Sequence, residues 1–202
     1  VCDNSLTDKS LISLETPGGI KYIDIYKENG KVVSARVNMG APILKSRDIP
    51  ALFDSDTVID LPLKVGAKSY RVTCLSMGNP HCVVFSNDAD SVNIQKTGPE
   101  FENHPAFPDR INTEFVQPLS GSHIKMRVWE RGAGETLSCG TGACAAAAAC
   151  ILNGYCKRDT DITVTLRGGE LSVNWSADGA VYLTGPAATV FTGEIACCGG
   201  AR

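Results

Sequence analysis

Short runs of alternating or β-branched apolar residues make up most of the 202-residue chain. Runs of this kind, bounded by Gly, Pro, Asn or Asp, are typical of β-strands. They predict strands at residues 11–14, 20–26, 31–37, 65–76, 81–85, 112–117, 123–130, 162–166, 170–175, 180–184 and 188–195. Most of the turns between them contain glycine, which tolerates backbone angles that other residues avoid. The chain is therefore expected to be mainly β-structure.

Two segments break this pattern and predict helices. The first is a short helix within residues 94–103. The second follows Cys139, where a Gly-Thr-Gly turn leads into an uncharged run of Ala and Cys with five consecutive alanines. Alanine has the highest helix propensity, and a helix that is apolar on every side is expected to be buried all round. Asn153 and Gly154 then supply a C-terminal stop.

The two ends of the chain follow the same order of strands and turns. The turn markers are Gly18-Gly19, Asn29-Gly30 and Gly40-Ala41-Pro42 at the start, and Gly168-Gly169, Asp178-Gly179 and Gly185-Pro186 at the end. This order fits an internal repeat of roughly 30 residues, with chance as the alternative, because hairpin turns favour these residues everywhere. The second copy is preceded by the Cys139 helix, and no equivalent helix precedes the first. A real repeat would mean that the sequence is cut off just after its other half-site.

Composition and charge exclude several classes of protein. The net charge is −3, and no basic run or interleaving of basic and aromatic residues indicates a nucleic-acid partner. No uncharged apolar segment reaches the roughly 18–20 residues that a membrane span needs. The first ten residues carry no signal-peptide pattern. These features favour a protein without nucleic-acid or membrane partners.

Nine cysteines are present, an odd number in a chain this long, and several of them stand in apolar runs. This is not typical of a disulfide framework. No C-x-x-C pair occurs and only three histidines are available, so zinc ligation is not expected. Most of the cysteines are interpreted as small buried hydrophobic residues, namely Cys74, Cys82, Cys144, Cys150 and Cys156. A reducing cytoplasm is the compartment that this pattern favours.

Cys139 is the candidate reactive thiol. The unpaired N–H groups and the positive dipole end at the start of a helix favour a thiolate and an anionic ligand. A thiolate placed there can act as a base or as a nucleophile. The alternative is a buried structural cysteine, against which the small residues Gly140 and Thr141 argue, because they leave backbone N–H groups open to a ligand carboxylate.

Other candidate residues stand at the ends of predicted strands, beside Gly-rich turns where function often lies. Glu130 and Arg131 are either a functional pair or a solvated ion pair at a strand end. His81 is either functional or a structural histidine, and Asn79 precedes it in an Asn-Pro turn that presents its neighbours. Asn112 carries no signal of its own.

Three motifs contain these residues: MGNPHCVVF at 77–85, RINTEF at 110–115 and WERGAGETLSCGTGACAAAAA at 129–149. They resemble the motifs of diaminopimelate epimerase, and VNMG at 37–40 and LTGPA at 183–187 extend the resemblance over nearly the whole chain. Proline racemase and the phenazine-biosynthesis isomerases share the fold of this family but are not similar in these motifs.

The resemblance implies an α+β fold of two similar halves, each an antiparallel, barrel-like sheet around a central buried helix, with the active site between them. Residues 40–184 would form one complete half, carrying Cys139 and its helix. Residues 1–39 with 185–202 would form the remainder of the amino-terminal half. Members of the family are often homodimers, so the resemblance raises a homodimer as one oligomeric state for this chain.

The resemblance also implies a reaction, the inversion of LL-diaminopimelate to the meso form for lysine and peptidoglycan synthesis, without pyridoxal phosphate or any other cofactor. One base removes the α-proton and an acid on the opposite face returns one, and two cysteines do this in the family. By resemblance Cys139 is one of the pair, Glu130 is its polar partner and His81 is the partner of the opposite cysteine. The substrate would be bound by Asn79, Asn112, Glu130, Arg131 and the backbone N–H groups of Gly140 and Thr141.

The chain departs from the family at one point: the other cysteine lies in a Cys-Gly-Asn-Gly-x-Arg-Cys motif that this sequence lacks. Cys2 is not a match, because no Gly-Asn-Gly turn follows it. The 202-residue chain is therefore expected to be truncated and to show no significant epimerase activity alone. The alternatives are a non-catalytic remnant that binds a diamino acid or a partner chain, and a thiol-redox or metal protein, which lacks ligand spacing.

Overall fold

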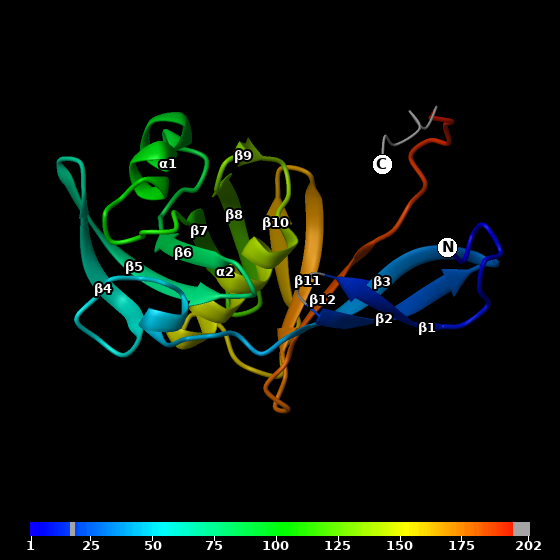
Figure 1. Cartoon of the computed structure of the whole chain (residues 1–202). Helices are drawn as coiled ribbons and strands as arrows, with labels where there is room; N and C mark the ends of the chain where they lie inside the picture. The colour runs from blue at the N-terminus through cyan, green and yellow to red at the C-terminus, as the bar shows by residue number, and fades with distance from the viewer. Residues whose placement is uncertain (17–18, 196–202) are drawn as a thin grey trace, which may run out of the picture.

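The computed structural model describes residues 1–16 and 19–195 and contains one large sheet with two α-helices (Figure 1). The strands are β1 (Leu11–Thr16), β2 (Gly19–Glu28), β3 (Lys31–Gly40), β4 (Val58–Val65), β5 (Lys68–Ser76), β6 (Pro80–Phe85), β7 (Asn112–Ser120), β8 (His123–Glu130), β9 (Gly134–Thr136), β10 (Ile162–Leu166), β11 (Gly169–Trp175) and β12 (Val181–Pro186). The helices are α1 (Ile94–Glu102), α2 (Gly140–Leu152) and the short 3₁₀-helix η1 (Ser46–Asp48).

The sheet is open and mixed, with the strand order β1-β2-β3-β12-β11-β10-β8-β7-β6-β5-β4, and β9 pairs with β8. The expectation of an antiparallel, barrel-like sheet was met only in part. Most pairs are antiparallel, but the sheet does not close, and β6 pairs with β7 and β8 pairs with β10 in parallel. The reason lies in the connections. The chain leaves the sheet through α1 after β6, and through α2 after the β8–β9 hairpin. A crossover of this length returns the next strand in the same direction.

Helix α2 packs against strands β5, β6, β7, β8, β10, β11 and β12. Its residues 142–150 are all buried, and they form a core with residues of the surrounding strands such as Val83, Val116 and Val164. Alanine side chains end at Cβ, so the strands approach the helix closely. Burial of this helix on every side is what its uncharged sequence predicts.

Helix α1 packs against the other face of the sheet, because the residues that it contacts alternate with those that contact α2. Val84 and Phe115 belong to the core beneath α1, whereas their sequence neighbours Val83 and Val116 belong to the core around α2. The predicted helix at 94–103 is confirmed within one residue, and the Asn93 side chain caps it by accepting the Lys96 N–H. The two helices thus cover opposite faces of the same strands.

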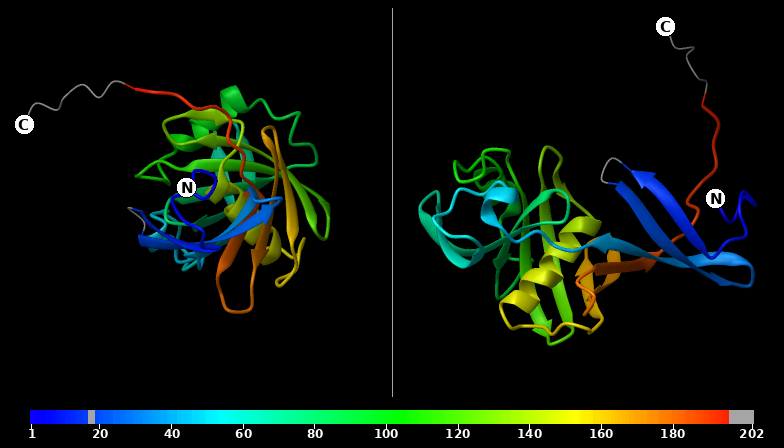
Figure 2. Two further views of the ribbon diagram at one scale, coloured as in Figure 1. Left: turned by 90° about the vertical axis from the view of Figure 1, so that its right-hand side faces the viewer. Right: turned by 60° about the horizontal axis from the view of Figure 1, so that its bottom comes forward.

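Strands β1, β2 and β3 project away from the rest of the molecule and are joined to it through the pairing of β3 with β12 (Figure 2). Large apolar side chains on these strands are exposed, among them Leu11, Leu14, Ile20 and Tyr22. An exposed apolar surface of this kind is typical of an interaction site.

Most predicted strands are confirmed within a few residues, and three details differ. Residues 65–76 contain a turn, since Gly66 has a φ of +57° and separates β4 from β5. Strand β4 and the short strand β9 were missed. Residues 188–195 are not a strand, since β12 ends at Pro186 and the chain that follows is exposed.

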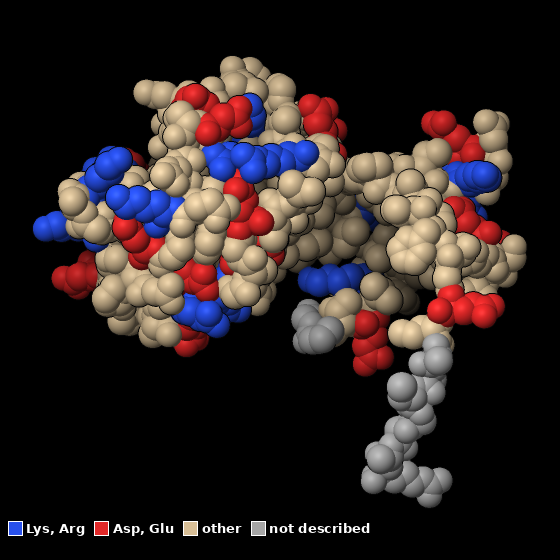
Figure 3. Space-filling view, turned by 90° about the horizontal axis from the view of Figure 1, so that it is seen from above, with Lys and Arg blue, Asp and Glu red and all other residues tan. Residues whose placement is uncertain are grey.

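Basic and acidic side chains are interspersed on the face seen in Figure 3. Among the described residues, no helix is both long and apolar enough to cross a membrane. Cys74, Cys82, Cys144, Cys150 and Cys156 are buried free thiols, as their apolar surroundings predict. Cys197 and Cys198 lie outside the described residues.

Candidate active site

The candidate residues gather at one end of the sheet, where β6 and β7 begin, β8 ends and α2 begins. His81 and Asn112 are direct partners across the parallel pair β6–β7. Thr113 pairs with Trp129 across β7–β8, which brings the end of β8 with Glu130 to the same end of the sheet. The topology therefore unites three motifs that are far apart in the sequence.

His81 is fully buried and its two ring nitrogens face two different side chains. Its Nδ1 lies 2.7 Å from Oε1 of Glu114, and its Nε2 lies 3.0 Å from Oδ1 of Asn79. Glu114 is also completely buried. A histidine held at both nitrogens keeps a fixed ring orientation, so Asn79 and His81 act as one unit.

Asn112 joins two loops of the site through its side-chain amide. Its Nδ2 donates to the carbonyl oxygen of Pro80 at 2.9 Å, and its Oδ1 accepts the N–H of Arg131 at 2.8 Å. The guanidinium of Arg131 is exposed and donates to the carbonyl oxygen of Asp109 at 2.8 Å. Asn112 thus fixes the backbone on either side of the site, and Arg131 keeps most of its donors available.

Cys139 is the N-cap residue of α2. Its Sγ accepts the N–H of Gly142 at 3.4 Å and lies 3.6 Å from Oγ1 of Thr141. Burial raises the pKa of the Cys139 thiol to about 11, the negative charges of Glu114 and Glu130 add to this rise, and the hydrogen bonds from Thr141 and Gly142 oppose it. Burial and the two carboxylates therefore raise the pKa of Cys139 by more than the donors at the helix start lower it. Without a ligand, Cys139 is a thiol.

The first turn of α2 presents free donors beside this thiol. Gly140 and Thr141 are half-buried, and their backbone N–H groups have no hydrogen-bond partner within the described chain. Gly142 must lack a side chain, since a Cβ there would lie 2.8 Å from Oε1 of Glu114 and 3.2 Å from Sγ of Cys139. Two open N–H groups at a helix start form a ready site for an anion such as a carboxylate.

Alkylation of Cys139 tests its thiol state. Only the thiolate reacts with iodoacetamide, and the pKa of Cys139 is about 11. The thiolate fraction, and with it the alkylation rate, is expected to rise about tenfold for each pH unit between pH 8 and pH 10. Mass spectrometry of the peptide that contains Cys139 measures this rate, and Cys139→Ala identifies the peptide. A rate that levels off below pH 9 would contradict the raised pKa.

Glu130 lies close enough to Cys139 for its charge to raise the pKa of that thiol. One oxygen of its carboxylate accepts the hydroxyl of Thr136, which holds it against β9. The pairing of Glu130 with Gly134 closes the tight turn that carries Arg131. Glu130 therefore lies near Cys139, which is nine positions further along the sequence.

Glu102, at the end of α1, holds the turn after β8 through hydrogen bonds. The sequence did not predict this role. The carboxylate of Glu102 accepts Nε1–H of Trp129 at 2.6 Å, the N–H of Gly132 at 2.8 Å and Nη1–H of Arg110 at 3.1 Å. The sequence gives no signal for this role, because the three donors come from different segments. Glu102 thereby positions the turn that carries Arg131.

Glu114 was also missed, although the sequence holds a signal for it. It is an acidic residue directly before the apolar pair Phe115-Val116 of a predicted strand, and a buried charge needs a partner. A carboxylate in such a strand is worth treating as a candidate site residue.

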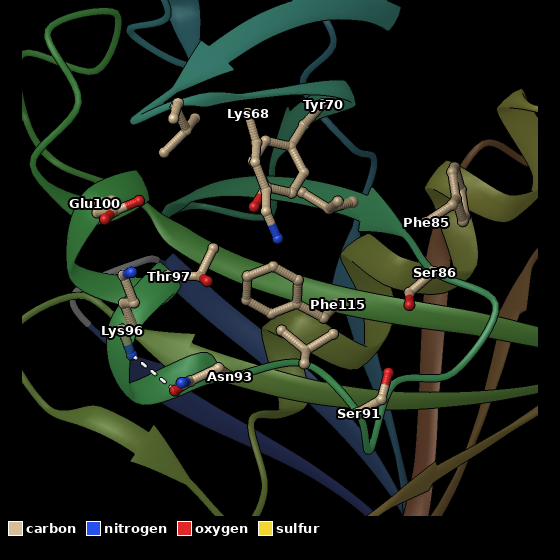
Figure 4. Close-up of a pocket in the computed structure, with 14 residues that line it drawn as sticks. Lys68, Tyr70, Phe85, Ser86, Ser91, Asn93, Lys96, Thr97, Glu100 and Phe115 are labelled. Atoms are coloured by element: carbon tan, nitrogen blue, oxygen red, sulfur yellow. Dashed lines mark hydrogen bonds between the residues drawn. The ribbon is translucent and has the colours of Figure 1, made fainter.

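A cavity of about 520 Å³ lies beside α1 and is lined by Lys68, Tyr70, Lys96 and Phe115 among others (Figure 4). None of the predicted site residues lines it. It belongs to the α1 face of the sheet, whereas the candidate site lies at the start of α2 on the opposite face. The cavity is therefore separate from the candidate site.

Solved structures with the same fold include a probable proline racemase and a hydroxyproline epimerase. A probable proline racemase from Agrobacterium radiobacter matches with a TM-score of 0.73 and 16% identity, over 97% of this chain and 64% of that protein. A hydroxyproline epimerase from Agrobacterium vitis matches with a TM-score of 0.67 and 14% identity, over 92% of this chain and 60% of that protein. The chain therefore shares the fold of these two proteins.

Sequence comparison narrows the class. The profile of the diaminopimelate epimerase family matches residues 73–190. A diaminopimelate epimerase from Agathobacter rectalis is 51% identical, and one from Methanococcus maripaludis is 50% identical, each over 96% of this chain and 70% of the relative. The chain belongs to the diaminopimelate epimerase family, whose members are isomerases.

Proposed function

We propose that this chain supplies one of the two acid–base groups for the cofactor-independent inversion of LL-diaminopimelate to meso-diaminopimelate. The observation that carries the proposal is the thiol of Cys139 beside the open N–H groups of Gly140 and Thr141. The α-proton of an amino acid is very weakly acidic, and as this proton leaves, negative charge develops on the substrate's α-carboxylate. Preorganised N–H donors stabilise that charge as it forms.

In this proposal the thiol of Cys139 protonates one face of the α-carbon in one direction of the reaction. In the other direction its thiolate removes the α-proton from the same face. Glu130, which lies near Cys139, is its polar partner. The amino and carboxylate groups at the far end of diaminopimelate are bound by Asn79, Asn112, Glu130 and Arg131. Arg131 suits a carboxylate because a guanidinium donates two parallel hydrogen bonds.

A two-base inversion needs a second group on the opposite face, which we propose is a cysteine outside this 202-residue sequence. Among the described residues Cys139 is the cysteine that caps a helix, and the other buried ones lie in the cores. We propose that residues 40–184 form one half of the enzyme, with strands around the central helix α2. Residues 1–39 and 185–202 would belong to the second half, which the exposed apolar side chains of β1 and β2 support.

The free state of all the described cysteines supports a reducing compartment such as the cytoplasm. The alternative function is a non-catalytic module that binds a diamino acid or a partner chain. It is favoured by one observation, the exposed apolar surface of the β1–β3 strands. The two functions differ in whether the chain supports inversion once a second cysteine is supplied.

A chimera tests the proposal. The 202 residues replace the matching part of the Agathobacter rectalis relative, which keeps the 30% of its own length that this chain does not match. We expect the chimera to convert LL-diaminopimelate to the meso form, and the 202-residue chain alone to show no conversion. Deuterium uptake from solvent and chiral chromatography measure both. A folded chimera without conversion would favour the binding module, and conversion by the chain alone would contradict the need for a second cysteine.

A further inference from the structure

Glu114 of β7 lies between His81 on β6 and the first turn of α2, which begins after Cys139. On one side its Oε1 is 2.7 Å from Nδ1 of His81, and both side chains have no exposed surface. On the other side it touches the first turn of α2, where a Cβ on Gly142 would come within 2.8 Å of the same oxygen. A carboxylate in this position contacts β6 and α2 together.

The second oxygen of Glu114 is buried and has no hydrogen-bond partner among the described residues. A buried carboxylate is costly unless it is paired, and His81 is the partner of its first oxygen. Burial raises the pKa of Glu114, while the charge of His81 and its hydrogen bond oppose that rise. The bond to His81 is thus the contact that offsets the cost of burying Glu114.

We propose that Glu114 is a positioning residue for His81. An ionised carboxylate only accepts hydrogen bonds, so it fixes the proton on Nδ1 of the imidazole. The other nitrogen, Nε2, then becomes the one that exchanges a proton with the site, next to Asn79. The hydrogen bond at one ring nitrogen sets the role of the other. That Nε2 faces an active site rests on the proposed function.

Other titratable groups face this pair from the elements around it. Glu130 at the end of β8 and Cys139 at the start of α2 are each coupled electrostatically to Glu114. Cys82, on β6 with His81, is fully buried and its pKa is raised, first by burial and also by its neighbours Cys74 and Glu114. None of these groups has a recorded hydrogen bond to a His81 ring nitrogen. Glu114 and Asn79 are therefore the two acceptors that compete for the proton of a neutral ring, Glu114 at Nδ1 and Asn79 at Nε2, and the buried carboxylate is the stronger acceptor.

Nitrogen-15 NMR of the 202-residue chain tests the proposal directly. Long-range proton–nitrogen spectra distinguish a protonated from an unprotonated ring nitrogen. We expect Nδ1 of His81 to carry its proton at every pH at which the chain is folded, including pH values at which the ring is neutral. A neutral ring with an unprotonated Nδ1 would overturn the proposal without any variant, so the test does not depend on whether variants fold.

The variant Glu114→Leu removes the acceptor and keeps a side chain of similar volume. Asn79 then remains as the polar partner, and its Oδ1 accepts a hydrogen bond from Nε2–H. We expect the neutral ring to change to the Nε2–H form. Val116→Ala is the control, since Val116 is buried in the α2 core on the same strand and its change should leave the Nδ1–H form in place. Retention of Nδ1–H in folded Glu114→Leu would overturn the proposal.

The outcome is independent of the proposed function. The NMR signature needs neither substrate nor turnover, so a chimera that fails to invert diaminopimelate leaves the test of Glu114 intact. Conversely, an unprotonated Nδ1 in an active chimera would refute the role of Glu114 and leave the epimerase proposal standing.

Discussion

Cys139→Ala is expected to lower the rate of diaminopimelate inversion on the order of a thousandfold in the chimera with the Agathobacter rectalis relative. The thiol is the proton donor for one face of the α-carbon, and alanine has no proton to give. Binding should change little, because the N–H groups of Gly140 and Thr141 belong to the backbone. The loss therefore falls on kcat rather than on KM, and steady-state kinetics in both directions measure it.

The matched control is Cys144→Ala. Cys144 lies on the same helix and is fully buried in the α2 core, and burial raises its pKa to about 12. It has no exposed surface through which to meet a substrate. The chimera should keep its activity within about tenfold when Cys144 is changed. Retained inversion in Cys139→Ala, or equal losses in both variants, would remove Cys139 from the mechanism.

Gly98→Ala is expected to lower the free energy of unfolding by roughly 3 kcal/mol, the upper range for an overpacked site. A Cβ at Gly98 would lie 2.3 Å from Cδ2 of Trp129, with two more ring atoms within 2.6 Å. Either α1 or the indole must move. Both movements disturb the hydrogen bond between Trp129 and Glu102, which fastens the turn after β8. Urea unfolding of the 202-residue chain measures the change.

Gly121→Ala provides the control for that experiment. A Cβ at Gly121 meets no atom within 4 Å, and its φ lies outside the left-handed region. The substitution should therefore change the stability by less than about 1 kcal/mol, with a gain expected from the lower entropy of the unfolded chain. Equal effects of the two substitutions would show that the contact between α1 and Trp129 is looser than the distances indicate.

The sequence predicted the elements with regular patterns. Strands β8 and β10 have the predicted bounds, and α2 begins directly after Cys139. Strand β4 was missed because its pattern is irregular: Asp60 has a φ of +52° at a bulge, and Pro62 interrupts the alternation. Proline is tolerated there because β4 is an edge strand. Irregular edge strands carry little periodic signal.

The candidate site was predicted as a set of motifs, and the links between them were not. Asn79 and His81 are sequence neighbours, so their contact follows from a local turn. The contact of His81 with Glu114 depends on the register of the parallel pair β6–β7, and a crossover of 26 residues (86–111) separates the two strands. Short-range patterns do not specify such a register. The high pKa of Cys139 is equally non-local, since it depends on burial and on two carboxylates from other strands.

The alanines of α2 have a further consequence for the site. An alanine side chain has no rotamers, so burying Ala145 to Ala149 costs no side-chain entropy and leaves no side-chain motion to loosen the packing. The position of the helix is set by backbone shape alone, and its first turn moves only if the whole helix moves. The donors of Gly140 and Thr141 are therefore held by a stiff helix, whereas the exposed side chain of Arg131 keeps rotamers with which to adapt to a ligand.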